Sequence, residues 1–160
     1  MEDLKIRRYK STDNPVVWEL HQLGLVEIGG KAWRGSPWDK DMDNIEDTYL
    51  KNGDFIVGEY KGRVVAMGAF KKITNKLAEL KRMRVHPDFQ RKGFGQAIIE
   101  NLEERARKTG YRRIILDTSE RNFKAEKFYL KNGYKEIKRG TLHVRNKIFH
   151  VIYYEKKLFL

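Results

Sequence analysis

The sequence predicts a mixed α/β fold for its 160 residues. Three observations support this prediction: short apolar runs alternate with amphipathic helical segments, two strand-like runs flank Lys61-Gly62, and a further strand leads through a glycine turn into a long helical segment. No repeat or low-complexity segment interrupts the pattern, and a chain of this length can bury a core of its own. We therefore expect a single domain spanning residues 1–160, with a mixed sheet and about four helices.

The first half of the chain is expected to contain two helices and four strands. Asp13 and Asp39 are suitable N-caps for the two helices. In the last of the four strands, Leu80, Met83 and Val85 alternate only imperfectly with charged residues. In chain order we expect a strand at 4–9, a helix after Asp13, a loop at 30–38, a helix from Asp39 to Asn52-Gly53, and strands at 54–60, 63–70 and about 77–85, where His86-Pro87 ends the strand.

The second half is expected to alternate helices and strands. Ile98, Leu102 and Ala106 recur at four-residue steps, which indicates a strong helix. In chain order we expect a helix from Gly93 to about Lys108, a strand at 111–117, a short helix at 120–133, a strand at 134–140 and a final strand at 147–157. The whole chain therefore has the order β-α-α-β-β-β-α-β-α-β-β.

The composition excludes several classes of chemistry. The chain has no cysteine, so disulfides, thiolate metal sites and cysteine nucleophiles are excluded. Its four histidines show no metal-ligand spacing, and no run of 18 apolar residues predicts a membrane span. The N-terminal residues also lack the apolar centre of a secretory signal. We expect a metal-free cytoplasmic protein.

Charge is distributed unevenly along the chain. The formal net charge is +12, yet residues 39–59 carry seven acids against two lysines, a local charge of −5. The remainder, at +17, would suit a polyanionic partner such as nucleic acid, although no RNA-reading or helix-turn-helix signature accompanies it. A solvated charged surface explains each segment equally well.

The stretch QRKGFG, residues 90–95, has the chemistry of a phosphate site. A helix begins with unpaired N–H groups at the positive end of its dipole. Gly93 and Gly95 remove side chains that would keep a pyrophosphate away from those groups, and Arg91 and Lys92 add positive charge. The alternative is a plain turn before a surface helix.

Two familiar phosphate motifs fit this stretch poorly. A Walker A loop requires GK followed by Ser or Thr, which is absent here. A dinucleotide fingerprint would use Gly93 and Gly95, with Asp117 as the acid that binds ribose, but Ile98 stands where a third small residue belongs.

A third candidate rests on a family resemblance. The tract AELKRMRVHPDFQRKGFGQAIIENL, followed by ILDTSERNFKAEKFYLKNGYKE, resembles the GNAT superfamily of acyl-CoA-dependent N-acetyltransferases. Gln90, Gly93 and Gly95 match that family's [QR]-x-x-G-x-[GA] loop, which binds the pyrophosphate of coenzyme A. The downstream segment matches N-x-x-A-x-x-F-Y-x-x-x-G-[FY] at Asn122, Ala125, Phe128, Tyr129 and Gly133-Tyr134.

The resemblance implies a GNAT-like fold in which the strand before the loop splays from its parallel neighbour. The pantetheine arm of acetyl-CoA would then pair with the free edge of that strand, as in strand addition. The main chain of Met83 and Val85 would make these contacts, and the Met83 N–H would polarise the thioester carbonyl. The residues implied in binding the cofactor are Met83, Val85, Gln90, Arg91, Lys92, Gly93, Phe94, Gly95, Gln96, Asn122, Ala125 and Phe128.

The resemblance also implies two catalytic residues. Tyr129 matches the tyrosine that protonates the departing CoA thiolate, a role suited to a phenol with a pKa near 10. Glu79 occupies a position where some relatives hold a glutamate base; the alternatives are a bound water as base and a surface glutamate paired with Lys81 or with a cation of a neighbouring strand. Asn122 is expected to contact pantetheine or to cap a helix, and both roles are compatible.

The acceptor amine is less well defined than the donor. Trp33 and Trp38, beside Asp41, would make an aromatic and anionic site for a cationic amine, or the tryptophans would simply close the core. We expect transfer of acetyl from acetyl-CoA to a small-molecule or peptide primary amine by direct attack, without nucleic acid, membrane or metal. The alternatives are a non-catalytic acyl-CoA-binding module and a nucleic-acid-binding protein. Homodimerisation is common in the family, but no sequence feature requires it.

Overall fold

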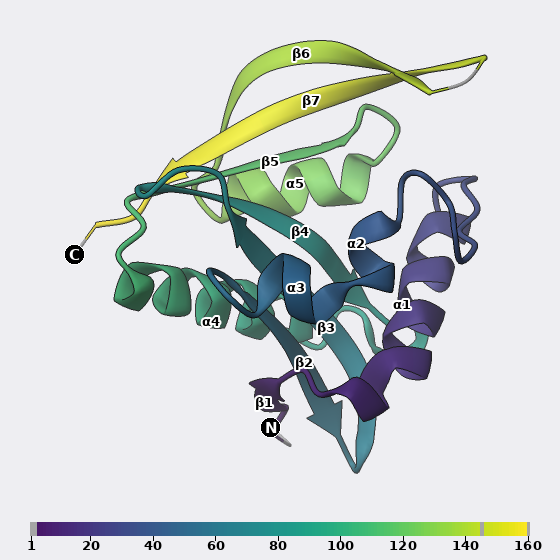
Figure 1. Ribbon diagram of the computed structural model, residues 1–160, viewed down its shortest axis with the longest axis vertical. Coiled ribbons are helices and arrows are strands. Elements are labelled where there is room, and N and C mark those ends of the chain that lie inside the picture. Colours follow the sequence, from purple (N-terminus) through teal and green to yellow (C-terminus); the bar gives the residue numbers. More distant parts are fainter. Residues whose placement is uncertain (1–2, 145, 160) are drawn as a thin grey trace.

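The computed structural model describes residues 3–144 and 146–159. A single seven-stranded sheet runs through the molecule in the order β1-β2-β3-β4-β5-β7-β6 (Figure 1). All neighbouring strands are antiparallel except β4 and β5. The strands are β1 (Lys5–Arg8), β2 (Asp54–Tyr60), β3 (Arg63–Lys72), β4 (Leu77–Val85), β5 (Arg113–Ser119), β6 (Lys135–Val144) and β7 (Lys147–Lys157).

Helices cover both faces of this sheet. One apolar core lies between the sheet and α4 and α5, and a second lies between the sheet and α1, α2 and α3. Figure 1 shows the long β6–β7 ribbon arching over one end of the sheet. The helices are α1 (Asn14–Val26), α2 (Lys40–Asp43), α3 (Ile45–Tyr49), α4 (Phe94–Thr109) and α5 (Phe123–Lys131), with 3-10 turns η1 (Ser11–Asp13) and η2 (Pro87–Phe89).

The predicted fold class and element order are confirmed, with two differences in the first half. Asp13 occupies the N-cap position of α1, but its side chain makes no capping hydrogen bond and instead accepts hydrogen bonds from Arg7 and from the Lys10 N–H. The helix expected after Asp39 is two short helices, because Asn44 between them adopts φ −139° and ψ 53°, which is not helical. Asp39 is buried and its side chain makes no capping hydrogen bond. Its carboxylate is used elsewhere, as described below.

The parallel pair β4–β5 separates part of the way along. Backbone pairing covers only Leu77 to Glu79 of β4, against Arg113 to Ile115 of β5, although β4 continues to Val85 and β5 to Ser119. The splay that the family resemblance implied is therefore present in this chain.

The same strand, β4, carries a bulge against its other neighbour, β3. Ala69 pairs with Lys81 and Met67 pairs with Arg84, so the pairing shifts by one residue in between. Arg82 lies in this bulge with a φ of +60°, a left-handed conformation that is uncommon for residues other than glycine.

Within the described ranges, no helix is long and apolar enough to cross a membrane.

Candidate active site

The splay frees the main-chain groups of the second half of β4. The His86 N–H donates to Val65 O of β3 at 2.8 Å, and because successive residues of a strand direct their amides to opposite sides, Val85 and Met83 direct theirs away from β3. Side chains occupy both carbonyls: Arg84 Nη1 donates to Met83 O at 3.0 Å, and Gln90 Nε2 donates to Val85 O at 3.1 Å. At Met83 and Val85, β4 therefore pairs with no strand on the β5 side, and side chains bind the two carbonyls instead.

The loop after β4 has the geometry that phosphate binding requires. Gly93 is the N-cap of α4 with a φ of +82°, and a side chain added there would meet no atom within 4 Å. A phosphate group could therefore approach the N–H groups of the first turn of α4 past Gly93 without meeting a side chain. Arg91 and Lys92 are exposed beside it and pair with no carboxylate among residues 3–144 and 146–159. These features fit a pyrophosphate group.

Three other residues predicted to bind the cofactor already contact other parts of the protein. Phe94 is buried against Tyr60, with ring centroids 5.1 Å apart. The Gln96 amide donates to Glu100 and Asn132, and an added side chain at Gly95 would lie in ordinary contact with Val85 and Phe128. Phe94, Gly95 and Gln96 are thus placed to offer main-chain N–H groups rather than side chains.

Asn122 and the residues that follow it begin α5. The Asn122 Oδ1 accepts a hydrogen bond from the Ala125 N–H at 3.1 Å, so the side chain caps the helix and leaves its amide NH₂ group for another partner. Phe128 packs against the Tyr129 ring at a centroid distance of 5.4 Å.

Tyr129 is buried where the sheet opens. Its hydroxyl has no hydrogen-bond partner among the described residues. Burial raises the pKa of Tyr129 to about 12; the charge of Asp117 on β5 acts in the same direction, and the charge of Arg84 on β4 opposes it. Tyr129 packs in the core beneath α4 and α5, whereas Arg84 extends toward α1 on the other face. The positive charge of Arg84 nevertheless favours ionisation of the Tyr129 hydroxyl.

Glu79 lies at the last paired position of the β4–β5 ladder, opposite Ile115. Its side chain is 17% exposed, and the Lys71 Nζ on β3 lies 3.6 Å from its carboxylate. The ion pair with lysine that was the alternative explanation is therefore formed, although Glu79 also stands at the start of the splay. Its role as a base remains a prediction.

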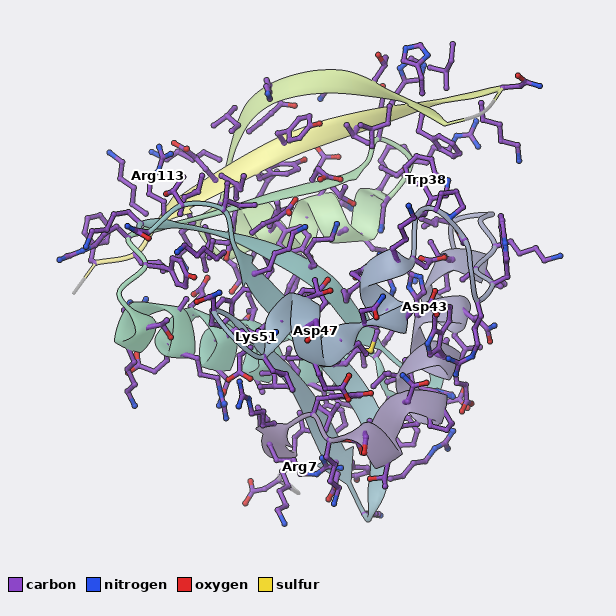
Figure 2. The ribbon with its side chains drawn as sticks, in the orientation of Figure 1. Arg7, Trp38, Asp43, Asp47, Lys51 and Arg113 are labelled. Carbon is purple, nitrogen blue, oxygen red and sulfur yellow. The ribbon has the colours of Figure 1, made fainter. Side chains whose placement is uncertain are left out.

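The predicted acceptor residues lie on the α1–α2 side of the sheet. Trp33 is 44% exposed and Trp38 is 37% exposed, so neither closes a core. Trp38 contacts Phe149 of β7 edge-on, with ring centroids 5.0 Å apart, and Figure 2 shows it directed toward the β6–β7 ribbon. Asp41 accepts two hydrogen bonds from Arg82, at 2.6 and 2.8 Å, and one from the Tyr49 hydroxyl.

Four polar residues of this site escaped sequence reasoning: His21, Asp39, Arg82 and Arg84. His21 is fully buried and its Nε2 lies 2.6 Å from Asp39 Oδ1. Burial lowers the pKa of His21; the hydrogen bond to Asp39 opposes this and the charges of Arg82 and Arg84 reinforce it, so the pKa lies below its usual value and the ring is neutral at neutral pH. The only signal in the sequence was the imperfect alternation of β4, which places two arginines where a regular strand would not.

Comparison with known proteins gives the same assignment as the geometry. The sequence profile of the acetyltransferase (GNAT) family matches residues 17–134. An uncharacterized N-acetyltransferase of Chlorobaculum tepidum, CT2212, is 33% identical over 110 residues, which are 69% of this chain and 66% of that protein, just under two thirds. The uncharacterized N-acetyltransferase YjgM of Escherichia coli is 28% identical over 137 residues, 82% of each chain. The chain therefore belongs to the GNAT family of acetyltransferases.

Solved structures of acetyltransferases share the fold of this chain. A GNAT acetyltransferase of Staphylococcus aureus superposes with a TM-score of 0.85 at 23% identity, over 98% of this chain and all of that one. The acetyltransferase yncA of Salmonella typhimurium, solved with acetyl-CoA, has a TM-score of 0.77 at 17% identity, over 99% of this chain and 95% of that one. These likenesses show the fold, and the match to the acetyltransferase family supports an acetyl-CoA-dependent acetyltransferase with acetyl-CoA as cosubstrate.

Proposed function

We propose that this protein is an N-acetyltransferase that moves an acetyl group from acetyl-CoA to a primary amine by direct attack, without an acyl-enzyme. The observation that carries the proposal is the splay of β4 from β5, with a buried tyrosine on one face and the acceptor side on the other. Acetyl-CoA supplies the activated acyl group when it is bound. Residues 1–160 are proposed to form one domain, since strands from both ends of the chain share one sheet.

The residues proposed to hold acetyl-CoA lie along one path. The N-terminus of α4, with Gly93 as its cap and with Arg91 and Lys92 beside it, offers N–H groups and positive charge for the pyrophosphate. Met83 and Val85 offer main-chain groups for the pantetheine arm after their carbonyls are released by Arg84 and Gln90. The Met83 N–H is placed to donate to the carbonyl oxygen that gains charge during transfer.

Tyr129 is proposed as the general acid that gives its proton to the departing thiolate. A raised pKa keeps its hydroxyl protonated throughout the physiological range, and no described residue competes for that proton. The acceptor amine must lose a proton before it attacks, and Glu79 at the start of the splay is the proposed acceptor of this proton, directly or through water. The cytoplasmic location and the homodimer stay predictions from the sequence.

The test is CoA release from acetyl-CoA across a panel of amines. Tyr129→Phe is expected to lower kcat by about 100-fold or more, the usual contribution of general acid catalysis, while CoA still binds. Tyr9→Phe is the matched control: it removes a hydroxyl at the far edge of the sheet, next to β1, and should change kcat less than about twofold. Turnover that survives in Tyr129→Phe would remove this residue from the mechanism; tight CoA binding with no acetylation of any amine would contradict the function itself.

A further inference from the structure

Arg84 is a partly buried cation without a counter-ion. Its Nε is buried and has no hydrogen-bond partner, and no carboxylate among residues 3–144 and 146–159 lies within ion-pair distance of it. Its two described contacts are neutral acceptors: Met83 O at 3.0 Å and His21 Nδ1 at 3.5 Å. Burial, reinforced by the charge of Arg82, lowers the pKa of Arg84 to about 10, so the guanidinium still carries its charge at neutral pH. An unpaired charge in such a place is costly, which calls for an explanation.

The neighbouring acids cannot balance this charge because other groups already occupy them. Arg82 takes Asp41 through two hydrogen bonds and lies 3.6 Å from Asp39. The remaining bond of Asp39 goes to His21. Arg82 is thus fully paired: its left-handed backbone, with φ +60°, lies in the bulge, and its side chain contacts both acids. Arg84, two residues later on the same face of the sheet, has none of them.

The position of Arg84 is as specific as its charge. The side chain passes so close to α1 that a side chain added at Gly24 would overlap its Cδ, at 2.3 Å. Its Nη1 holds the carbonyl of Met83 at the free edge of β4, and its charge acts on the Tyr129 hydroxyl. Arg84 therefore stands on the acceptor side of the opening, next to the proposed point of transfer.

We propose that Arg84 binds a carboxylate of the acceptor, so that the substrate is an amine that also carries a carboxylate group. The Nε–H of Arg84 has no partner and its Nη2 makes only the long contact with His21 Nδ1, so this edge of the guanidinium can present the two parallel donors that a carboxylate accepts. The substrate carboxylate would supply the missing counter-ion and place its amine beside the opening. This assignment rests on the proposed function, because it names the substrate class of the same site.

The assignment differs from the sequence-based hypothesis of a cationic amine held by Trp33, Trp38 and Asp41. The Asp41 carboxylate accepts three hydrogen bonds inside the protein, so its charge is already neutralised. The uncompensated charge on this side is positive. An acceptor with a carboxylate therefore matches the site better than a polyamine does.

The first experiment uses the wild-type protein and needs no variant. CoA release is measured with matched pairs of acceptors, each a free amino acid and its carboxamide, together with a polyamine. We expect kcat/KM to favour the carboxylate member of at least one pair by about 10- to 100-fold, the range for a hydrogen-bonded charge pair shielded from solvent. Equal rates for both members of every pair, or a preference for the polyamine, would overturn the assignment.

The second experiment follows the preference in variants. In Arg84→Met the ratio of kcat/KM within a pair should fall by about 10- to 100-fold. Arg84→Lys keeps the charge but loses the two parallel N–H donors, so it should retain part of the preference for the carboxylate. Arg112→Met is the control, because it removes the same charge from an exposed residue just before β5, at the end of the sheet away from the splay. Its ratio should stay at the wild-type value.

The outcomes separate the possible roles of Arg84. An equal loss for both members of a pair in Arg84→Met would show that Arg84 assists the reacting groups or braces β4, and would overturn the assignment. If that variant did not fold, the wild-type comparison would still decide. Absence of turnover with every amine would overturn the proposed function and this assignment with it, whereas turnover without a carboxylate preference would overturn the assignment alone.

Discussion

Asp41→Asn tests whether this carboxylate is part of the scaffold or part of the acceptor site. The amide mimics the protonated acid and keeps the shape of the side chain. Burial alone would raise the pKa of Asp41, but the hydrogen bonds and charge of Arg82 outweigh it and lower the pKa from 3.8 to about 2. Each unit of pKa corresponds to about 1.4 kcal/mol, so the charged form stabilises the folded state by about 2 kcal/mol.

The sign of the pH dependence follows from this lowered pKa. A group whose pKa is depressed by folding contributes its full stability above its unfolded pKa, here near 3.8, and loses it as pH falls through about 2. Asp41→Asn should therefore lower the free energy of unfolding by about 2 kcal/mol at pH 7. At pH 3 the difference from wild type should shrink to about half of that value.

The measurement is urea unfolding of both proteins at the two pH values. Asp47→Asn is the matched control: Asp47 on α3 and Lys51 in the turn after it form an exposed pair, both labelled in Figure 2, with side chains 75% and 70% exposed. Such surface pairs contribute at most about 0.5 kcal/mol. If Asp41→Asn cost no more than this control, or cost the same at both pH values, the pairing with Arg82 would not stabilise the fold. If it then raised KM for the acceptor, Asp41 would belong to the acceptor site.

Two further predictions concern the donor side. Gly93→Ala and Gly62→Ala should each lower the free energy of unfolding by about 1 kcal/mol in urea, since both glycines have a positive φ and open surroundings. Only Gly93→Ala should weaken CoA binding, roughly tenfold by calorimetry. Equal CoA affinities of the two variants would contradict the assigned phosphate site. Because the pKa of Tyr129 is raised to about 12, its protonated form persists in alkali, and kcat should stay level from pH 8 to about 10.5; a decline centred near pH 10 in a pH–rate profile would argue against Tyr129 as the acid.

Local patterns predicted most of the fold and the donor side of the site. The Asn122 cap, the hairpin turn and the four-residue steps of α4 are short-range signals, and the phosphate loop and the start of α5 are contiguous in sequence. The caps expected at Asp13 and Asp39 make no capping hydrogen bond. The acceptor side depends on contacts such as Arg82 with Asp41, which are 41 positions apart. No short-range pattern encodes such a pair. Sequence therefore placed Asp41 in a substrate site, while its partner arginine became visible only in three dimensions.

The bulge at Arg82 also shifts the alternation of side chains along β4 by one residue. Before it, Leu80 faces the core beneath α4; after it, Met83 and Val85 face that same core, three and five positions later instead of two and four. If β4 kept all its residues but ran as a regular strand, an even count from Leu80 would turn both arginines into the apolar layer and both apolar side chains away from it. The left-handed backbone at Arg82 is therefore what lets this sequence place its charged and apolar side chains on opposite faces of β4.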